Sequence, residues 1–458
     1  MHVAVVGGGV AGLSAALEAT RLGHRVTLLE SSGRLGGKVA VSEVGGLQVD
    51  EGADSMLTRV PDGLQLARDA GLHDELTAPA AGQAFVWSRG ALRPLPAGTL
   101  LGLPTDLAAL ARSGLLSGRG LNRVPLDLVL PGAPVAEDVS VGDLVRRRLG
   151  REVVERLVDP LLGGVYAGRA DRLSLQATLP QLVRHAAQHR SLLLAARAAR
   201  GATPPTDGPL FASLPGGLGR LPEAVAEQSG ADVRTSTTVR ALERTATGWR
   251  LTTGSAAAPK AVDADAVVLA VPAAPAARLL RDLAPAAAED LAGVEYASVA
   301  IVTLVFRGHL QTAGSGYLVP AVEGRTTKAV TFSSRKWAHL SGPHEVVRAS
   351  VGRYGDTADL QRADEELVAV VLRELGQTVG PLPRLRDSRV TRWGGGLPQY
   401  AVGHLDLVRR VRRAVSQHQG LAVAGAAYDG VGVPAVARSG REAVGTALRQ
   451  NGGHDRAQ

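Results

Sequence analysis

The chain opens with a short apolar run, which is followed by a glycine-rich turn and a stretch of mixed polarity. Val3–Val6 are all apolar, as expected of a buried parallel strand. A helix is predicted from about Leu13 to Leu22, and Gly23 directly after it is a residue type that commonly ends helices. Arg25–Glu30 predicts a second strand. A strand, a helix and a strand in this order favour a doubly wound sheet of parallel strands.

The stretch between about residues 95 and 210 has a different pattern. Leu, Ala and Arg dominate it, and strand-like alternation of apolar and polar residues is rare. A helix is predicted from Val141 to about Val158, with Ser140 as its N-cap, because a Ser side chain can accept a hydrogen bond from the first turn. This stretch is therefore expected to be mainly helical.

Strand patterns return after residue 210. A helix is predicted at Asp356–Leu375 from the spacing of its apolar residues, and Leu421–Ala424 predicts a late strand before a second glycine-rich turn and a C-terminal helix. Other apolar or alternating runs predict strands at Asp232–Arg234, Thr237–Arg244, Trp249–Thr253, Ala266–Val271, Ala297–Phe306 and Val346–Val351.

This order of elements predicts an α/β fold, α+β overall, in which a Rossmann-like nucleotide-binding domain is assembled from separated pieces. A β-rich partner domain and a helical insertion are threaded between those pieces. We expect the nucleotide-binding domain at 1–75, 210–272 and 420–458, the partner domain at 76–96 and 273–419, and the helical insertion at 97–209.

Composition narrows the class of protein. Hydrophobic residues make up 45% and charged residues 21% of the 458 residues, which is typical of a globular chain with two or three subdomains. The net charge is +8, yet only four of the basic residues are Lys, so a general bias toward Arg explains the charge better than a nucleic-acid site. Aromatic residues amount to only 3%, which also argues against base stacking.

The absence of cysteine excludes disulfides, thiolate metal sites and a redox-active cysteine pair. The eleven histidines show no metal-ligand spacing, so no metal is expected. The chain begins directly with a strand rather than a signal peptide, and no run of about 18 apolar residues predicts a membrane span. We therefore expect a cytoplasmic protein.

The first glycine-rich turn has the spacing of a dinucleotide-binding motif. Gly7, Gly9 and Gly12 form G-x-G-x-x-G between a strand and a helix. The first glycine permits the tight turn, the second lets a pyrophosphate approach the backbone, and the third allows close packing of helix on strand. Glu30 ends the second strand, eighteen residues after Gly12, where a carboxylate can bind ribose hydroxyls.

The residues after Glu30 favour FAD over NAD. Ser31–Lys38 contains Arg34 and two further glycines, and this E-x3-R-x-G-G extension resembles the FAD signature of the amine-oxidase-like flavoproteins. In that superfamily, a turn that corresponds to Gly52–Ser55 passes the flavin. The C-terminal turn from Gly425 to Val433 also enters a helix, whose N–H groups would face the flavin edge where charge develops on reduction.

Several middle segments resemble the porphyrinogen oxidases of heme synthesis. They are Leu157–Gly168 with Asp171–Ser174, Leu214–Leu218, Leu397–Tyr400 with Gly403 and His404, and Tyr428–Val433 with Ser439–Arg441. Almost the whole chain is covered by this resemblance. It implies an FAD domain, a substrate domain and a helical domain that can associate peripherally with the inner face of a membrane.

The resemblance also implies which residues contact the ligands. Tyr166 and Tyr400 are candidates for lining the substrate cavity, and no side chain stands out as a dedicated catalytic base. The residues expected to contact FAD are Gly7, Gly8, Gly9, Val10, Ala11, Gly12, Glu30, Ser31, Arg34, Lys38, Gly52, Ala53, Asp54, Ser55, Val239, Gly425, Val431, Gly432 and Val433.

One departure bears on the substrate. Eukaryotic protoporphyrinogen IX oxidases carry an active-site arginine at the place that Ala84 takes here, just before Phe85-Val86-Trp87. This favours the branch that resembles bacterial coproporphyrinogen III oxidases, which form coproporphyrin III. That substrate carries four propionates, so an arginine-rich pocket would suit it.

The expected reaction removes six electrons from a porphyrinogen in three flavin cycles, with oxygen reduced to hydrogen peroxide. The cofactor supplies the chemistry and the protein supplies position and electrostatics. Transfer of the porphyrin to a ferrochelatase follows from pathway logic alone. Three alternatives stay open: a protoporphyrinogen IX oxidase, another flavoenzyme of this fold such as a carotenoid desaturase, and a non-catalytic binding module like the Rab GDP-dissociation inhibitors.

Overall fold

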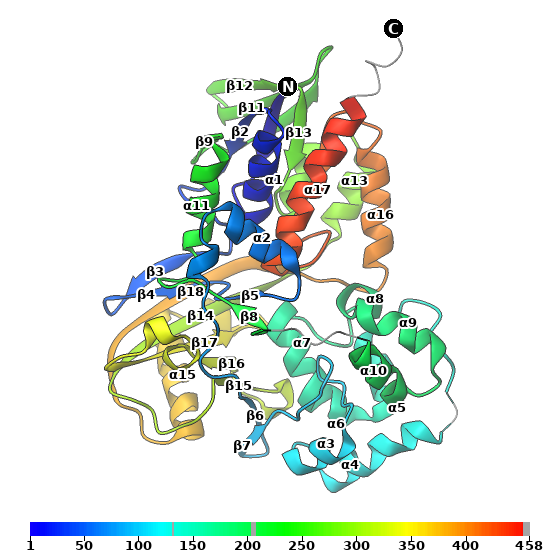
Figure 1. Ribbon diagram of the computed structural model, residues 1–458, viewed down its shortest axis with the longest axis vertical. Coiled ribbons are helices and arrows are strands. Elements are labelled where there is room, and N and C mark those ends of the chain that lie inside the picture. The colour runs from blue at the N-terminus through cyan, green and yellow to red at the C-terminus, as the bar shows by residue number, and fades with distance from the viewer. Residues whose placement is uncertain (131, 203–207, 452–458) are drawn as a thin grey trace.

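A five-stranded parallel sheet organises the part of the molecule that contains the N-terminus (Figure 1). The structure is a computed structural model that describes residues 1–130, 132–202 and 208–451. Each neighbouring pair of strands in this sheet is parallel, as predicted. In spatial order the strands are β19 (Leu421–Val423), β13 (Ala266–Leu269), β1 (His2–Val6), β2 (Arg25–Leu29) and β9 (Asp232–Arg234).

Helices cover one face of the parallel sheet, and Figure 1 shows the first and last of them side by side although they lie at opposite ends of the chain. Leu13, Leu66, Leu221 and Val444, one from each helix, share a buried core with Val5 of β1. These helices are α1 (Val10–Arg21), α2 (Pro61–Asp69), α11 (Arg220–Ser229) and α17 (Val433–Asn451).

The opposite face is covered by a small antiparallel sheet and three helices. Val411 of α16 and Leu280 of α12 share a core with Val267 of β13, so two parts of the range 273–419 pack on the parallel sheet rather than on the partner domain. The elements are β10 (Ala241–Arg244), β11 (Trp249–Ser255), β12 (Ala258–Ala264), α12 (Ala273–Leu280), α13 (Pro285–Ala292) and α16 (His404–Val415).

A seven-stranded mixed sheet forms the second layer, in which only β15 and β6 pair in parallel. Its order is β18 (Arg384–Pro398), β14 (Tyr296–Arg307), β17 (His344–Val351), β16 (Thr327–Phe332), β15 (Gly316–Leu318), β6 (Ala84–Ser88) and β7 (Ala91–Pro94). Helix α15 (Asp364–Val379) covers one face. Val305 and Val346 on the other face pack against the hairpin of β3 (Val41–Val44) and β4 (Leu47–Asp50).

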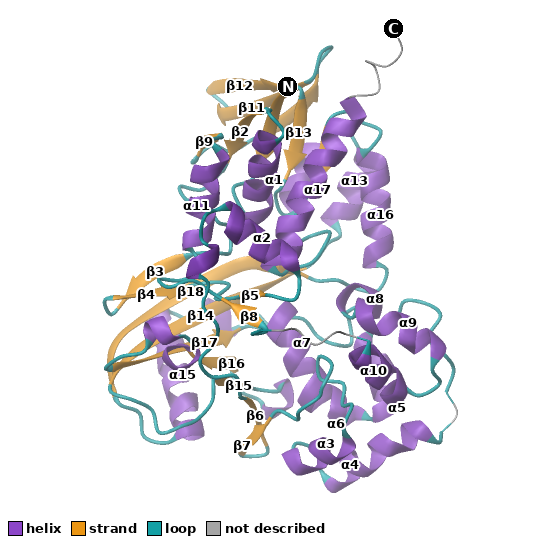
Figure 2. Cartoon of the chain, in the orientation of Figure 1, coloured by secondary structure: helices purple, strands orange, loops and turns teal. Residues whose placement is uncertain are grey.

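The helices between residues 97 and 202 form a third body, which Figure 2 shows as a purple cluster beside the mixed sheet. They have their own buried core, which Val86 of β6 and Tyr400 join. The helices are α3 (Leu107–Ser113), α4 (Gly118–Arg123), α5 (Val141–Leu149), α6 (Arg151–Val153), α7 (Asp159–Tyr166), α8 (Leu175–Thr178), α9 (Pro180–Gln188) and α10 (Leu192–Gly201). Residues 203–207 and 452–458, at the ends of two predicted pieces, lie outside the described residues.

Three predicted elements differ from the structure. The helix expected over 141–158 is interrupted at Gly150, whose φ of 97° does not continue a helix, and helical structure then resumes and runs to Tyr166. The strand expected from Thr237 begins only at Ala241, because Thr237 N–H donates to Glu30 O (2.7 Å) instead of pairing with β11. Helix α15 begins at Asp364 rather than 356.

The late start of α15 has a tertiary cause. The Arg392 guanidinium donates to the carbonyls of Leu360 and Arg362 and so holds the segment before α15 outside the helix.

In the described part of the chain, every helix is too short or too polar to cross a membrane.

Candidate functional site

The turn between β1 and α1 is shaped by glycines with different tasks. A Cβ atom on Gly7 would lie 2.5 Å from Ala270 O, and one on Gly12 would lie 1.8 Å from Gly7 O. Both glycines are therefore required by packing. A Cβ on Gly9, in contrast, would meet no protein atom within 4 Å. Gly9 is the N-cap of α1, so its open side offers helical N–H groups to an anion, and the turn fits a dinucleotide pyrophosphate.

Glu30 lies beside this turn, as its place at the end of β2 predicts. Its carboxylate accepts the N–H of Gly8 at 2.6 Å and the N–H of Ser32 at 2.7 Å, and Ser31 is exposed next to it. The segment before Val239 runs alongside, because Ser236 N–H donates to Ser32 O at 2.7 Å. Val239 itself lies outside any strand, contrary to the prediction, and packs on the core beneath the sheet.

The second glycine-rich loop folds against the first. Gly36 N–H donates to Gly8 O at 2.8 Å. The Arg34 guanidinium donates to Leu35 O (3.0 Å) and Gly37 O (2.7 Å), and it lies 5.6 Å from the ring centre of Trp393. Arg34 therefore holds the loop in shape, and its predicted contact with FAD stays a prediction.

The turn Gly52–Ser55, which the sequence predicts beside the flavin, is held by two cations. Lys336 Nζ lies 2.9 Å and Arg348 Nη1 lies 3.4 Å from Asp54 Oδ2. Arg348 also donates to Gly52 O at 2.6 Å. Burial acts to raise the pKa of Asp54, but the two cations outweigh it and hold that pKa below its usual range. Asp54 is therefore a carboxylate that anchors the turn.

The pKa of Asp50, just before this turn, is shifted in the opposite direction from that of Asp54. Burial raises the pKa of its carboxyl to about 7, although Arg348 acts in the other direction. Gly219 N–H donates to it at 3.2 Å, so Asp50 joins the turn to the segment 214–219.

Sequence reasoning missed Lys336, Arg348 and Trp393. Trp393 donates its indole N–H to Glu51 O at 2.9 Å, and its ring lies 3.4 Å from where a Cβ on Gly52 would be. One signal was present, because Arg348 stands among the apolar residues Val346, Val347 and Ala349 of β17, and an arginine that is buried there needs a partner. Trp393 had no such signal, since β18 has no regular apolar pattern.

The C-terminal turn is built from its own hydrogen bonds. Gly425 N–H donates to Ser439 Oγ at 2.9 Å, and Ser439 Oγ donates to Asp429 at 2.5 Å. Arg412 of α16 pairs with the same carboxylate at 2.6 Å. The turn leads into α17, which lies so close to α1 that a Cβ on Gly440 would be 2.1 Å from Ala11 O. The first and last glycine-rich turns thus enter neighbouring helices.

The two tyrosines predicted at the substrate cavity lie next to each other, with their ring centres 5.6 Å apart. Tyr400 is only 2% exposed, its hydroxyl donates to Ala426 O at 2.5 Å, and its ring stacks on His404 at 4.1 Å. It therefore supports the C-terminal turn, and its predicted place at the substrate cavity stays a prediction. Tyr166 ends α7, and burial raises its pKa to about 12. Its role at the cavity stays a prediction.

The structure brings together the predicted FAD residues from four distant stretches, 7–12, 30–38, 52–55 and 425–433. The first and last stretches follow the carboxyl ends of β1 and β19, where parallel sheets bind their ligands. Arg348 of β17 connects the third stretch to the mixed sheet. A long extended cofactor would have backbone N–H groups available along these turns.

Comparison with known proteins agrees with this arrangement. The coproporphyrinogen III oxidase of Bacillus subtilis is 34% identical, with 98% of each chain covered. The protein of the same name from Mycobacterium leprae is 37% identical over 95% of this chain and 96% of its own. A solved structure from Exiguobacterium, provisionally assigned as a protoporphyrinogen oxidase, has a TM-score of 0.87 and 34% identity, covering 98% of this chain and 99% of that one.

The profile of the family described as flavin containing amine oxidoreductase matches residues 10–448. This match and the architecture confirm the predicted fold and the predicted FAD cofactor. The chain therefore belongs to the family of flavin containing amine oxidoreductases and is an FAD-dependent oxidoreductase.

Proposed function

We propose that this protein oxidises coproporphyrinogen III to coproporphyrin III, with molecular oxygen as the final electron acceptor. The observation that carries this proposal is similarity along nearly the whole chain to proteins named coproporphyrinogen III oxidase. The segments around 157–174 and 397–404, which resemble porphyrinogen oxidases, include α7 with the loop after it and the loop between β18 and α16. They adjoin the C-terminal turn, because Tyr400 donates to Ala426 O.

The proposed reaction balances over three rounds. Each round removes two electrons and two protons from the porphyrinogen, and one oxygen molecule becomes one hydrogen peroxide. Bound FAD supplies the two-electron acceptor in each round. Gly9 and the first turn of α1 would hold its phosphates, and Glu30 its ribose. Lys336 and Arg348 would keep the Gly52–Ser55 turn in place beside the flavin.

The mixed sheet carries a cation suited to a substrate carboxylate. Lys328 lies in β16, which packs against α7, and it is only 8% exposed. Its amine makes no hydrogen bond or ion pair with the described residues, and burial together with nearby Arg353 lowers its pKa to about 7. A buried amine without a partner gains most from an anionic ligand. We propose that Lys328 binds one propionate of the substrate.

The choice between the two porphyrinogens rests on charge. Ala84, at the start of β6, pairs with Gly316 of β15 and so lies in the same sheet as Lys328. The arginine of the eukaryotic protoporphyrinogen enzymes is thus replaced by a small neutral residue, while a cation is present two strands away from β6. Four propionates need more cationic partners than two, and we propose that Lys328 is one of the cations that a coproporphyrinogen would require.

The decisive experiment offers coproporphyrinogen III and protoporphyrinogen IX separately to the purified holoenzyme under air. Porphyrin fluorescence and hydrogen peroxide are followed together. We expect a faster reaction with coproporphyrinogen III and three peroxides per porphyrin formed. Equal rates, or a preference for protoporphyrinogen IX, would refute the substrate assignment. Flavin-loaded protein that oxidises neither compound would favour another flavoenzyme of this fold, such as a carotenoid desaturase.

Three further expectations from the sequence stay proposals: a cytoplasmic location, peripheral contact with a membrane, and transfer of the product to a ferrochelatase. The membrane contact is supported by exposed apolar side chains on the helical insertion, where Leu126, Val129 and Leu130 follow one another closely and Val129 is 70% exposed. Co-sedimentation with anionic lipid vesicles, compared between the protein and its Val129→Asp variant, tests this point.

A further inference from the structure

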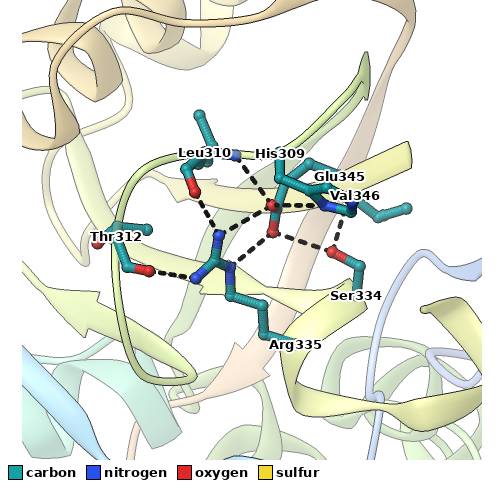
Figure 3. Close-up of polar contacts among 7 residues, drawn as sticks. All are labelled: His309, Leu310, Thr312, Ser334, Arg335, Glu345 and Val346. Atoms are coloured by element: carbon teal, nitrogen blue, oxygen red, sulfur yellow. Dashed lines mark hydrogen bonds and ion pairs between the residues drawn. The ribbon is translucent and has the colours of Figure 1, made fainter. Parts of the chain in front are cut away.

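A fully buried carboxylate lies in the mixed sheet, and its contacts include none of the residues predicted to bind a ligand. Glu345, the second residue of β17, is 0% exposed. Its two oxygens accept from the Arg335 guanidinium (3.0 and 3.1 Å), the Ser334 hydroxyl (3.0 Å) and the Leu310 N–H (3.1 Å), as Figure 3 shows. Exposed His309 lies 3.6 Å away at the edge of the group. Glu345 of β17 thus binds donors from two other segments, α14 and the loop that contains Leu310.

The partners of Glu345 are themselves tied to the same segments. Arg335 also donates to Leu310 O at 2.5 Å and to Thr312 O, and Ser334 Oγ accepts the Val346 N–H at 3.1 Å. Ser334 and Arg335 belong to the short helix α14 (Ser333–Lys336). The cluster therefore clamps α14 onto β17 and onto the loop that follows β14.

The two elements that Glu345 joins are also the two that hold the flavin turn. Lys336 follows Arg335 in α14 and lies 2.9 Å from Asp54. Arg348 follows three residues after Glu345 in β17, and it contacts both Asp54 and Gly52 O. The positions of Lys336 and Arg348 relative to each other thus depend on how α14 is fixed to β17.

The chemistry of the cluster fits a positional task better than a purely stabilising one. A buried ion pair loses much of its hydration energy, and apolar residues of similar size often stabilise a core equally well. What an ion pair adds is direction, because a guanidinium and a carboxylate bind in a narrow set of geometries. A cluster of this kind can set the place of α14 to within a few tenths of an ångström, as a binding site requires.

We propose that Glu345 is a positioning residue for FAD: through Arg335 and α14 it places Lys336 against Asp54 and so shapes the Gly52–Ser55 turn that receives the flavin. This role depends on the FAD site and not on which porphyrinogen is oxidised. Its test therefore measures FAD binding, so that a wrong substrate assignment would leave the result unchanged.

The test compares Glu345→Gln with a matched control, Glu374→Gln. Glu374 is also a buried carboxylate beside the mixed sheet, and it accepts the N–H groups of Thr326 and Thr327 at 2.9 Å each. It makes no contact with Asp54. Both variants are expected to unfold at lower denaturant concentration than the parent protein. Only Glu345→Gln is expected to weaken FAD binding, by about tenfold, which corresponds to one charged hydrogen bond.

A double variant shows whether the effect passes through Lys336. FAD dissociation constants are measured by flavin fluorescence for Glu345→Gln, Lys336→Met and both together. If Glu345 acts through Lys336, the double variant binds FAD about as weakly as Lys336→Met alone. The visible absorption bands of the bound flavin are expected to shift in the same variants and not in Glu374→Gln.

Two results would overturn the proposal. One is a Glu345→Gln protein that is less stable but binds FAD with the parent affinity and spectrum, as expected of a merely structural residue. The other is a loss of affinity in the double variant equal to the product of the two single losses. If Glu345→Gln does not fold, Arg335→Lys decides in its place, because it keeps the charge and removes only the paired guanidinium contacts.

Discussion

The two glycines of the first turn provide a direct test of how the structure binds FAD. In Gly9→Ala, the new methyl group meets no protein atom within 4 Å, and the backbone angles of Gly9 (φ −73°, ψ 177°) suit alanine. In Gly12→Ala, the methyl carbon would lie 1.8 Å from Gly7 O, whereas such contacts are essentially never closer than 3.0 Å. The turn or the helix would have to move by at least 1.2 Å.

The flavin-free forms of the two variants are therefore expected to differ in their free energy of unfolding. Overpacking costs about 1–3 kcal/mol, and the upper end applies here because the methyl group meets a backbone oxygen and not a flexible side chain. Since alanine gains about 1 kcal/mol over glycine inside a helix, Gly12→Ala is expected to lose about 2 kcal/mol. Gly9→Ala should be unchanged or up to about 1 kcal/mol more stable, because alanine restricts the unfolded chain. Both variants are expected to bind FAD at least about 100-fold more weakly, since a methyl group on Gly9 takes the space of the pyrophosphate.

Urea unfolding of the flavin-free proteins and FAD titration measure the two effects separately. The reasoning predicts that Gly9→Ala loses affinity without losing stability, and that Gly12→Ala loses both. If Gly9→Ala binds FAD with the parent dissociation constant, the phosphates do not lie at this turn. If Gly12→Ala unfolds at the same urea concentration as the parent, the close approach to Gly7 O does not constrain the fold.

Two further predictions concern the substrate and the helical insertion. Because the pKa of Lys328 is lowered to about 7, the unfolding free energy of the parent protein should rise from pH 7 toward 10.5, while that of Lys328→Met shows no such rise. Coproporphyrin III, used as a tetracarboxylate ligand, should bind the parent more weakly as the pH rises above 7; equal affinity and equal pH dependence in Lys328→Met would exclude a propionate contact. Asp127→Ala should cost about 3–5 kcal/mol in urea unfolding, because buried Asp127 accepts from Arg148 (2.6 Å), Ser191 (2.7 Å) and Leu193 N–H (2.9 Å). A loss below about 1 kcal/mol would contradict that reasoning.

Local features of the chain were predictable where all the residues that determine them lie within one short segment. The β1–α1–β2 unit is such a case, because the apolar runs, the three glycines and Gly23 all act on neighbouring residues. The same holds for Ser140, whose hydroxyl accepts the N–H of Asp143 at 3.1 Å and so begins α5 as expected. The FAD cofactor followed from these local motifs together with the resemblance to known flavoproteins.

Features that depend on contacts between residues far apart in the chain were not predictable from the pattern of apolar and polar residues. Strand β18 has little apolar alternation, and it exists because β14 pairs along most of its length. Helices α12 and α16 pack on the parallel sheet although their sequences lie inside the predicted partner domain. The pairing partner of β18, strand β14, lies at least 77 residues earlier in the chain, and Val411 of α16 packs in one core with Val267 of β13, 144 residues earlier.

The site shows the same division. The amino-acid sequence by itself determined the glycine turns and the acidic residue at the end of β2, since each is set by backbone geometry over a few residues, and the resemblance of these motifs to known flavoproteins then gave the class of cofactor. Only the tertiary structure decided what holds those turns: Lys336 and Arg348 at Asp54, Trp393 under Gly52, and Tyr400 beneath the C-terminal turn. A buried charge or an aromatic ring acquires its role from the partner it meets, and that partner is chosen by the packing of distant elements.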